Sequence, residues 1–357
     1  MKAAICYEFG KPLVVEEVNI DPPQKGEVKV RLGATAICHS DISIIEGALG
    51  RFLPLVAGHE CAGYVEEVGE GVKSVKPGDT VVVSVLKSCG RCYYCVTGRP
   101  HLCEADWPLN KESRISNKRG QRPAQSIGGF AEYIIVDQSQ AVKIPKEVPI
   151  DCASLLACGV IAGFGAVANR AKVEPLSSVV VIGTGGVGLN AVQGAAYVGA
   201  RPVIAVDIAD NKLAAARTFG ATHTINSKQE DAVKAVMQLT SGRGADYVFV
   251  AVGNNAAIGQ GVAMTGKRGT TVIIGMPPMQ ENMSLPAMAF MGGERVLMGS
   301  LMGSTRLPVD IPKLVALYQT GYLKLDELIT KRYPLEKINE AIDSLLKGEA
   351  LRNVIVF

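Results

Sequence analysis

The order of apolar and polar positions divides the chain into segments of different character. In residues 1–150, short runs rich in Val and Ile alternate with turns that contain Gly, Pro and Asp, which is typical of strands joined by tight turns. We expect strands at residues 28–32, 64–68, 80–85 and 133–136. This part of the chain is therefore predicted to be β-rich.

The middle of the chain follows another pattern. Compact apolar runs at residues 178–182, 202–206, 247–250 and 271–274 are separated by helical patterns such as 213–219 and 232–240. Alternating strands and helices predict a parallel sheet with helices on both faces, and so an α/β fold. The C-terminal part is predicted to hold helices at 311–320 and 335–347 and a last strand at 353–357.

Composition narrows the function classes. A chain of 357 residues predicts two domains, and 48% hydrophobic with 20% charged residues excludes disorder, collagen and coiled coil. A net charge of +3 and 5% aromatic residues argue against a nucleic-acid partner. No apolar stretch approaches the ~20 residues that span a bilayer, and residues 1–10 lack the apolar segment of a signal peptide. We expect a cytoplasmic protein with no membrane partner.

A glycine motif lies where the first strand of the middle region meets a helix. Residues 179–189 read as a strand, then G-x-G-x-x-G, then an Ala-rich helix. In this pattern Gly183 allows the tight turn, Gly185 lets the backbone approach a pyrophosphate, and Gly188 lets the helix pack on the strand. The helix N-terminus at Gly186 and Val187 then faces the phosphates. A glycine-rich turn without a ligand is the alternative.

An acidic residue lies at the end of the next predicted strand. Asp207 lies 19 residues after Gly188, near the distance expected for a carboxylate that binds the ribose hydroxyls. A carboxylate there repels a 2′-phosphate, so NAD is favoured over NADP. Lys212 could reach the same ribose.

Four of the nine cysteines are clustered. Cys89, Cys92, Cys95 and Cys103 have the spacing C-x2-C-x2-C-x7-C, and four thiolates suit a structural tetrahedral zinc. An iron–sulfur cluster would place the fourth cysteine after three residues and follow it with Pro, whereas Glu104 follows here. Iron–sulfur and unrelated or redox cysteines are the weaker alternatives. Spacing alone does not group the scattered Cys38, His59 and Cys158, and a lone Cys or His is usually a core residue.

Several motifs together resemble the zinc-dependent medium-chain alcohol dehydrogenases. They are the segment Gly58-His59-Glu60-x2-Gly63-x5-Gly69, the four-cysteine cluster, the glycine motif and the ending at residues 351–357. The resemblance covers nearly the whole chain. It implies a β-rich GroES-like catalytic domain of residues 1–158 and 302–357, and a doubly wound Rossmann domain of residues 159–301 that binds NAD. Zinc and nicotinamide would lie between them, since ligand sites favour domain interfaces.

The resemblance also implies metal-site roles. Cys38, His59 and Cys158 would bind a catalytic zinc with one open position, and the four clustered cysteines a second, structural zinc. Asp41 would orient His59 through its other ring nitrogen. Glu60 would lie behind the zinc and exchange as a transient ligand.

Further roles concern the cofactor and the proton. His39 and Arg352 would contact the cofactor pyrophosphate, and Ser40 would be the first proton acceptor. Ser43 occupies the place where many relatives carry a proton-passing histidine, so the relay would use the cofactor ribose and water or be slower.

The implied activity is reversible hydride transfer between NAD and a primary or secondary alcohol, with its aldehyde or ketone. Val85 replaces an aromatic wall residue of the family, which should widen the pocket, and Trp107, Leu301 and Met276 are candidate walls. The family suggests a homodimer or homotetramer through the edge of the nucleotide domain.

Particular residues favour or disfavour other functions. The basic stretch 111–122 carries five basic residues against Glu112; it is predicted to be a long solvated surface loop, or else to attract an anionic substrate such as a glutathione adduct. A glutathione-dependent formaldehyde dehydrogenase type is therefore one rival. A polyol dehydrogenase is disfavoured by Cys158, because many of those enzymes use Glu as third ligand. A non-catalytic NAD-binding protein of the same fold is disfavoured by the complete set of metal ligands, and a zinc finger by the low net charge and the missing His pair.

Overall fold

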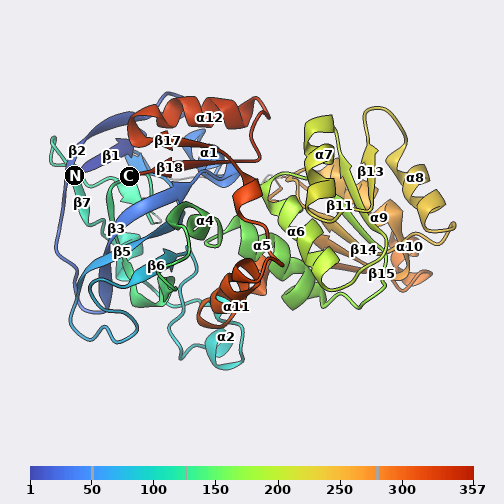
Figure 1. Cartoon of the computed structure of the whole chain (residues 1–357), viewed down its shortest axis with the longest axis horizontal. Coiled ribbons are helices and arrows are strands. Elements are labelled where there is room, and N and C mark those ends of the chain that lie inside the picture. The colour runs from blue at the N-terminus through green and yellow to red at the C-terminus, as the bar shows by residue number, and fades with distance from the viewer. Residues whose placement is uncertain (50–51, 126, 278–280) are drawn as a thin grey trace. The chain divides into compact units, whose positions relative to one another are not determined.

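The chain forms two compact units in a computed structural model that describes residues 1–49, 52–125, 127–277 and 281–357 (Figure 1). Met1–Cys158 and Arg306–Phe357 form the first unit, and Gly159–Thr305 forms the second. The breaks thus lie at 158/159 and 305/306, next to the expected 158/159 and 301/302.

The first unit is built on a mainly antiparallel seven-stranded sheet. Its order is β10-β6-β5-β3-β18-β17, and β9 pairs with β3. These strands are β3 (Glu27–Ala36), β5 (Glu60–Val68), β6 (Thr80–Val83), β9 (Tyr133–Asp137), β10 (Ala141–Lys143), β17 (Ile329–Pro334) and β18 (Arg352–Val356). Buried Val28, Val30, Leu32 and Val65 form part of one core against this sheet. The strands expected in this region are therefore present, and the last strand of the chain joins them.

Smaller elements complete the first unit. β1 (Lys2–Ile5), β2 (Val14–Ile20) and β7 (Ile115–Asn117) form a three-stranded sheet, and β4 (Leu55–Val56) pairs with β8 (Ala124–Gln125). The helices of this unit are α1 (His39–Ile45), α2 (Tyr93–Val96), α3 (Pro108–Lys111), α4 (Ile150–Leu155), α11 (Leu307–Gln319) and α12 (Ile338–Leu346). A second core of buried side chains, among them Ile5, Ile37, Phe130 and Ile355, lies between these elements.

The second unit has a parallel six-stranded sheet of order β13-β12-β11-β14-β15-β16. Its strands are β11 (Val179–Ile182), β12 (Val203–Asp207), β13 (His223–Asn226), β14 (Ala245–Val250), β15 (Thr265–Ile273) and β16 (Val296–Gly299). In chain order this is 3-2-1-4-5-6, the doubly wound Rossmann arrangement. The predicted α/β fold class, with a GroES-like and a Rossmann part, is confirmed.

The helices of the second unit connect these strands. They are α5 (Gly159–Gly165), continued by a π-helical stretch (Ala166–Ala171), and α6 (Gly186–Tyr197), α7 (Asp210–Thr218), α8 (Ala232–Leu239), α9 (Asn255–Met264) and α10 (Ala287–Met291). Figure 1 shows α6 to α9 around the sheet. No described helix combines the length and apolar character that crossing a membrane requires.

Several elements differ from the sequence expectations, among them the following two. Residues 111–122 are not one long loop, because β7 lies within them and pairs with β2. The edge strand β16 was not predicted, since its outer residues Val296 and Gly299 are exposed and its run is short.

Candidate metal centres and nucleotide site

One group of buried metal-binding side chains lies in the first unit. Cys38, His59, Glu60 and Cys158 each offer a ligand atom, and these atoms lie within 4.8 Å of one another. Cys38 caps the N-terminus of α1, His59 and Glu60 lie where β5 begins, and Cys158 follows α4. The fold thus brings together three segments that sequence spacing alone did not group.

Asp41 fixes two of these segments. Its carboxylate accepts hydrogen bonds from the backbone N–H of Cys38 at 3.0 Å and of Gly58 at 3.0 Å, and lies 2.7 Å from His59 Nδ1. His59 Nε2 then faces the group, 3.3 Å from Cys158 Sγ. Burial is the largest single effect and opposes a charge on His59, but Asp41 and Cys38 together raise the pKa of the imidazole well above its ordinary value. The orienting contact between Asp41 and His59 that the resemblance implied is present in the geometry.

The two thiols of this group, Cys38 and Cys158, interact so that one ionises more easily and the other less easily. A hydrogen bond from Cys158 lowers the pKa of Cys38 well below that of an ordinary thiol, although burial acts against this. The same bond raises the pKa of Cys158, and burial adds to the rise. The site therefore favours a buried negative charge, which a bound cation would balance.

Glu60 lies at the inner side of the group. It is fully buried and forms an ion pair with Arg352 of β18. Its Oε1 atom has no hydrogen-bond partner, and burial raises the pKa of Glu60 to about 7 despite the guanidinium. Two thiols, one imidazole and an unpartnered buried carboxylate oxygen form a donor set that fits zinc. Arg352, predicted to contact a pyrophosphate, pairs with Glu60, and its pyrophosphate contact stays a prediction.

Helix α1 presents the predicted proton acceptor. Ser40 Oγ lies 3.4 Å from His59 Nε2, and Ser40 is half-buried. His39 is exposed. The Ser43 hydroxyl donates to the His39 carbonyl at 3.2 Å, so it is engaged by its own helix.

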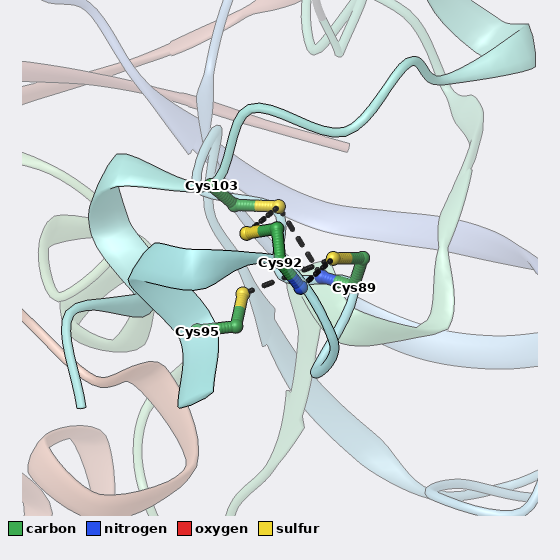
Figure 2. A group of neighbouring side chains, drawn as sticks. All are labelled: Cys89, Cys92, Cys95 and Cys103. Carbon is green, nitrogen blue, oxygen red and sulfur yellow. Dashed lines mark hydrogen bonds between the residues drawn. The ribbon is translucent and has the colours of Figure 1, made fainter. Parts of the chain in front are cut away.

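The second group of possible metal ligands is the cluster Cys89, Cys92, Cys95 and Cys103, called the lobe below (Figure 2). The ligand atoms of Cys89, Cys92, Cys95 and Cys103 lie within 4.8 Å of one another, and all four thiols are free. The Cys89–Cys95 sulfurs are 4.0 Å apart and the Cys92–Cys103 sulfurs 3.9 Å apart. A zinc tetrahedron with bonds of about 2.3 Å places its sulfurs about 3.8 Å apart, so the lobe has the size that zinc needs.

Backbone groups of the lobe support thiolates. The N–H of Cys92 donates to Cys89 Sγ and the N–H of Cys89 donates to Cys103 Sγ, both at 3.3 Å. Backbone hydrogen bonds, above all from Cys95, lower the pKa of Cys92 to about 6. These donors favour the deprotonated form that a metal binds.

In the second unit, the glycine motif joins β11 to α6. Gly183 has φ +85°, a conformation that favours glycine. A Cβ atom at Gly188 would lie 1.7 Å from the Gly183 carbonyl oxygen, whereas a Cβ atom at Gly185 would meet nothing within 4 Å. Helix and strand thus pack tightly at Gly188, and the backbone is open at Gly185 beside the helix N-terminus formed by Gly186 and Val187. This geometry fits a dinucleotide phosphate.

Asp207, at the end of β12, is bound to the glycine motif. Its Oδ2 accepts from the backbone N–H of Thr184 at 2.7 Å and from the Thr184 hydroxyl at 3.0 Å. Its Oδ1 accepts from the N–H groups of Ile208 at 2.7 Å and Ala209 at 3.1 Å. Lys212 is half-buried in the first turn of α7. Sequence reasoning missed Thr184, because the glycine motif leaves its position unspecified.

The basic stretch 111–122 is largely neutralised. Arg114 is buried and pairs with Glu27 at 2.8 Å and Glu112 at 2.9 Å. The remaining basic residues also have partners: Lys111 with Asp106, Lys118 with Glu17, Arg122 with Asp21, and Arg119 over the Tyr7 ring. These pairs weaken the hypothesis that the stretch attracts an anionic substrate.

The candidate pocket walls differ in exposure. Val85 and Trp107 are half-buried, while Met276 and Leu301 are exposed. Their roles stay predictions.

Comparisons with known proteins agree with this geometry. The model of the alcohol dehydrogenase GroES-like domain matches residues 24–146, and that of the zinc-binding dehydrogenase domain matches residues 186–320. The chain is 40% identical to the NDMA-dependent alcohol dehydrogenase of Amycolatopsis methanolica over 99% of its length and 98% of the relative.

Comparison with solved structures also finds alcohol dehydrogenases. The benzyl alcohol dehydrogenase of Acinetobacter calcoaceticus has a TM-score of 0.93 and 33% identity, over 100% of this chain and 99% of that one. An alcohol dehydrogenase zinc-binding domain protein from Burkholderia ambifaria has a TM-score of 0.95 and 34% identity, over 100% and 98%. The predicted resemblance is confirmed: this chain belongs to the zinc-dependent medium-chain alcohol dehydrogenases, oxidoreductases that act on alcohols.

Proposed function

We propose that the chain interconverts a primary or secondary alcohol and its carbonyl compound, with NAD as the hydride carrier and a zinc ion at Cys38, His59 and Cys158. The observation that carries the proposal is the buried group of two thiols and an imidazole, with the Ser40 hydroxyl beside it. When bound, zinc supplies Lewis acidity toward an alcohol oxygen, and NAD supplies a hydride acceptor.

The side chains around the group have distinct tasks in this proposal. Ser40 accepts the alcohol proton and passes it on. Asp41 keeps Nε2 of His59 directed at the group by holding its Nδ1 atom. Glu60 balances Arg352 and keeps one carboxylate oxygen available to the group.

The cofactor assignment rests on the second unit. The open backbone at Gly185 leaves room for a pyrophosphate, and the buried Asp207 carboxylate disfavours a 2′-phosphate. The NDMA dependence of the Amycolatopsis methanolica relative makes the electron acceptor a second question. We therefore infer NAD as the bound hydride carrier and treat NDMA as an acceptor to be assayed beside it.

The proposal extends to a second zinc ion, to the class of alcohol and to the oligomeric state. The lobe would hold a second, structural zinc, so two zinc ions per chain are expected. The benzyl alcohol dehydrogenase neighbour and the small Val85 side chain favour bulky alcohols, benzylic ones included. A homodimer or homotetramer through this edge of the second unit is supported by the end strand β16, in which Val296 is exposed.

A substrate panel tests the proposal. Aliphatic, benzylic and carboxylated alcohols are incubated with NAD, NADP or NDMA, with and without glutathione, while NADH absorbance or acceptor loss is followed and zinc is measured on the same preparation. We expect turnover of neutral alcohols without glutathione, a preference for NAD over NADP, and two zinc ions per chain. A glutathione requirement would favour the formaldehyde dehydrogenase type, and two zinc ions with no turnover of any alcohol would contradict the proposal.

A further inference from the structure

The three candidate ligands of the catalytic metal are supported in different ways. Asp41 holds the first two, because it binds the backbone of Cys38 and the ring of His59. Its third donor, the N–H of Gly58, belongs to the His59 segment. Cys158 comes from another part of the chain, the turn after α4, so its position needs a support of its own.

A buried hydroxyl lies at that turn. Ser84, directly after β6, is 1% exposed, and its Oγ donates a hydrogen bond to the carbonyl oxygen of Ala157 at 2.6 Å. Ala157 is the residue before Cys158. Because one peptide unit joins that carbonyl to the nitrogen of Cys158, the bond restricts where the Cys158 backbone can lie.

Ser84 is itself held in place. The side chain of Gln140 donates to the Ser84 carbonyl at 2.9 Å, and the N–H of Ser84 donates to the Gln140 carbonyl at 3.1 Å. Gln140 is buried, and its Oε1 accepts from the N–H of Asp137 at 3.2 Å. The hydroxyl is therefore held where β6 ends and β10 begins, by the two hydrogen bonds between Ser84 and Gln140.

We propose that Ser84 is a positioning residue for the metal ligand Cys158, acting through the Ala157 carbonyl. The inference rests on the proposed zinc site at Cys38, His59 and Cys158. Asp41 and Ser84 then form two independent supports, one for the first two ligands and one for the third. Removing Ser84 loosens Cys158 and leaves the Asp41 contacts in place.

Partners outside the ligand shell typically change metal affinity by about 10- to 100-fold. We therefore expect Ser84→Ala to lose catalytic zinc to a competing chelator about tenfold or more faster than the wild type. The lobe zinc should be retained equally, because the hydrogen bond that Ser84→Ala removes ends on the Ala157 carbonyl and on none of the lobe ligands Cys89, Cys92, Cys95 and Cys103.

Ser154→Ala is the matched control. Ser154 is also a fully buried serine, and its Oγ donates to the Asp151 carbonyl at 2.7 Å. It lies in α4, in the same segment as Cys158, but its bond does not involve the neighbour of a ligand. We expect this variant to keep its zinc as the wild type does.

The experiment measures zinc content during dialysis against a chelator, and maps alkylated cysteines by mass spectrometry at each time. Support consists of early zinc loss in Ser84→Ala, with Cys158 alkylated early and the lobe cysteines protected. Equal zinc retention in Ser84→Ala and wild type overturns the positioning role, as does equal loss in both serine variants. A wild type whose Cys38 and Cys158 are never protected by zinc contradicts the proposed metal site instead.

Discussion

At the scale of single residues, the proposal makes the Ser40 hydroxyl the proton acceptor beside the candidate catalytic metal. It is half-buried and lies 3.4 Å from His59 Nε2. In the proposed role, this hydroxyl accepts a proton from the substrate and passes its own proton on. Such proton transfers typically contribute about 10²–10⁴-fold to a rate.

Ser40→Ala is therefore expected to lower kcat for alcohol oxidation by about 10²–10⁴-fold and to leave zinc content unchanged, since Ser40 is not among the ligands. Steady-state kinetics and metal analysis on the same sample check this. Ser43→Ala is the control, because the Ser43 hydroxyl donates to the His39 carbonyl of its own helix. Turnover by Ser40→Ala within twofold of the Ser43→Ala value would remove Ser40 from the relay.

The residues differ in how far the sequence could predict them. The glycine motif is local, so the separate roles of Gly183 and Gly188 follow from a short segment, and the structure places them accordingly. The contact of Asp41 with His59 is accompanied by a hydrogen bond from the N–H of Gly58, a residue that has φ +90° and whose Cβ would lie 2.6 Å from the Phe130 nitrogen. That contact joins distant segments, and no local pattern contains it.

At the scale of elements, the stretch from α3 to β7 is anchored from inside. Arg114 is 1% exposed and donates two hydrogen bonds to Glu27 of β3, at 3.1 and 2.8 Å. Those bonds raise the pKa of Arg114 above its already high value, so the guanidinium stays charged at neutral pH. From the sequence, the basic stretch 111–122 was predicted to be a solvated loop. Charge alone does not reveal that one of its basic residues has a buried partner on another strand.

Breaking the ion pair between Arg114 and Glu27 should lower the stability of the folded protein. We expect Arg114→Met to lower the free energy of unfolding by about 3–5 kcal/mol, because it leaves the Glu27 carboxylate buried without its partner. The double variant Arg114→Met with Glu27→Leu should recover much of that loss. Denaturant unfolding measures both. Lys118→Met, which removes the exposed pair with Glu17, should change stability by less than about 1 kcal/mol, and an equally small effect of Arg114→Met would contradict the anchoring role.

The positions of strands were predictable where apolar runs are long and alternate with helices, as in β11, β12 and β14. The position was not predictable for β16, whose Val296 and Gly299 are both exposed in the described chain. The sequence of such a strand carries no clear β pattern. Its extended conformation is stabilised by pairing with β15, which a local pattern does not reveal.

At the scale of the whole molecule, that same strand bears on the proposed dimer. Among the described strands of its sheet, β16 lies at the end of the order and pairs with β15. Unpaired strand edges invite pairing with another chain. Met288 and Met291 in α10, which precedes β16 in the chain, and Leu301 after β16 are also exposed apolar residues, and contiguous exposed apolar side chains mark contact surfaces. A second copy that joins its own β16 would cover both features.

Val296→Lys should therefore shift the protein from dimer to monomer at a concentration where the wild type is dimeric, because a charged edge residue opposes strand pairing. Light scattering coupled to size-exclusion chromatography measures the mass. Leu239→Lys is the control: Leu239 is also exposed, but it ends α8, which packs near β13 at the other end of the sheet. A wild type that runs as a monomer would contradict the proposed dimer, and a Val296→Lys variant that stays dimeric would place the interface elsewhere. A monomer produced by both variants would mean that added charge, and not the β16 edge, controls association.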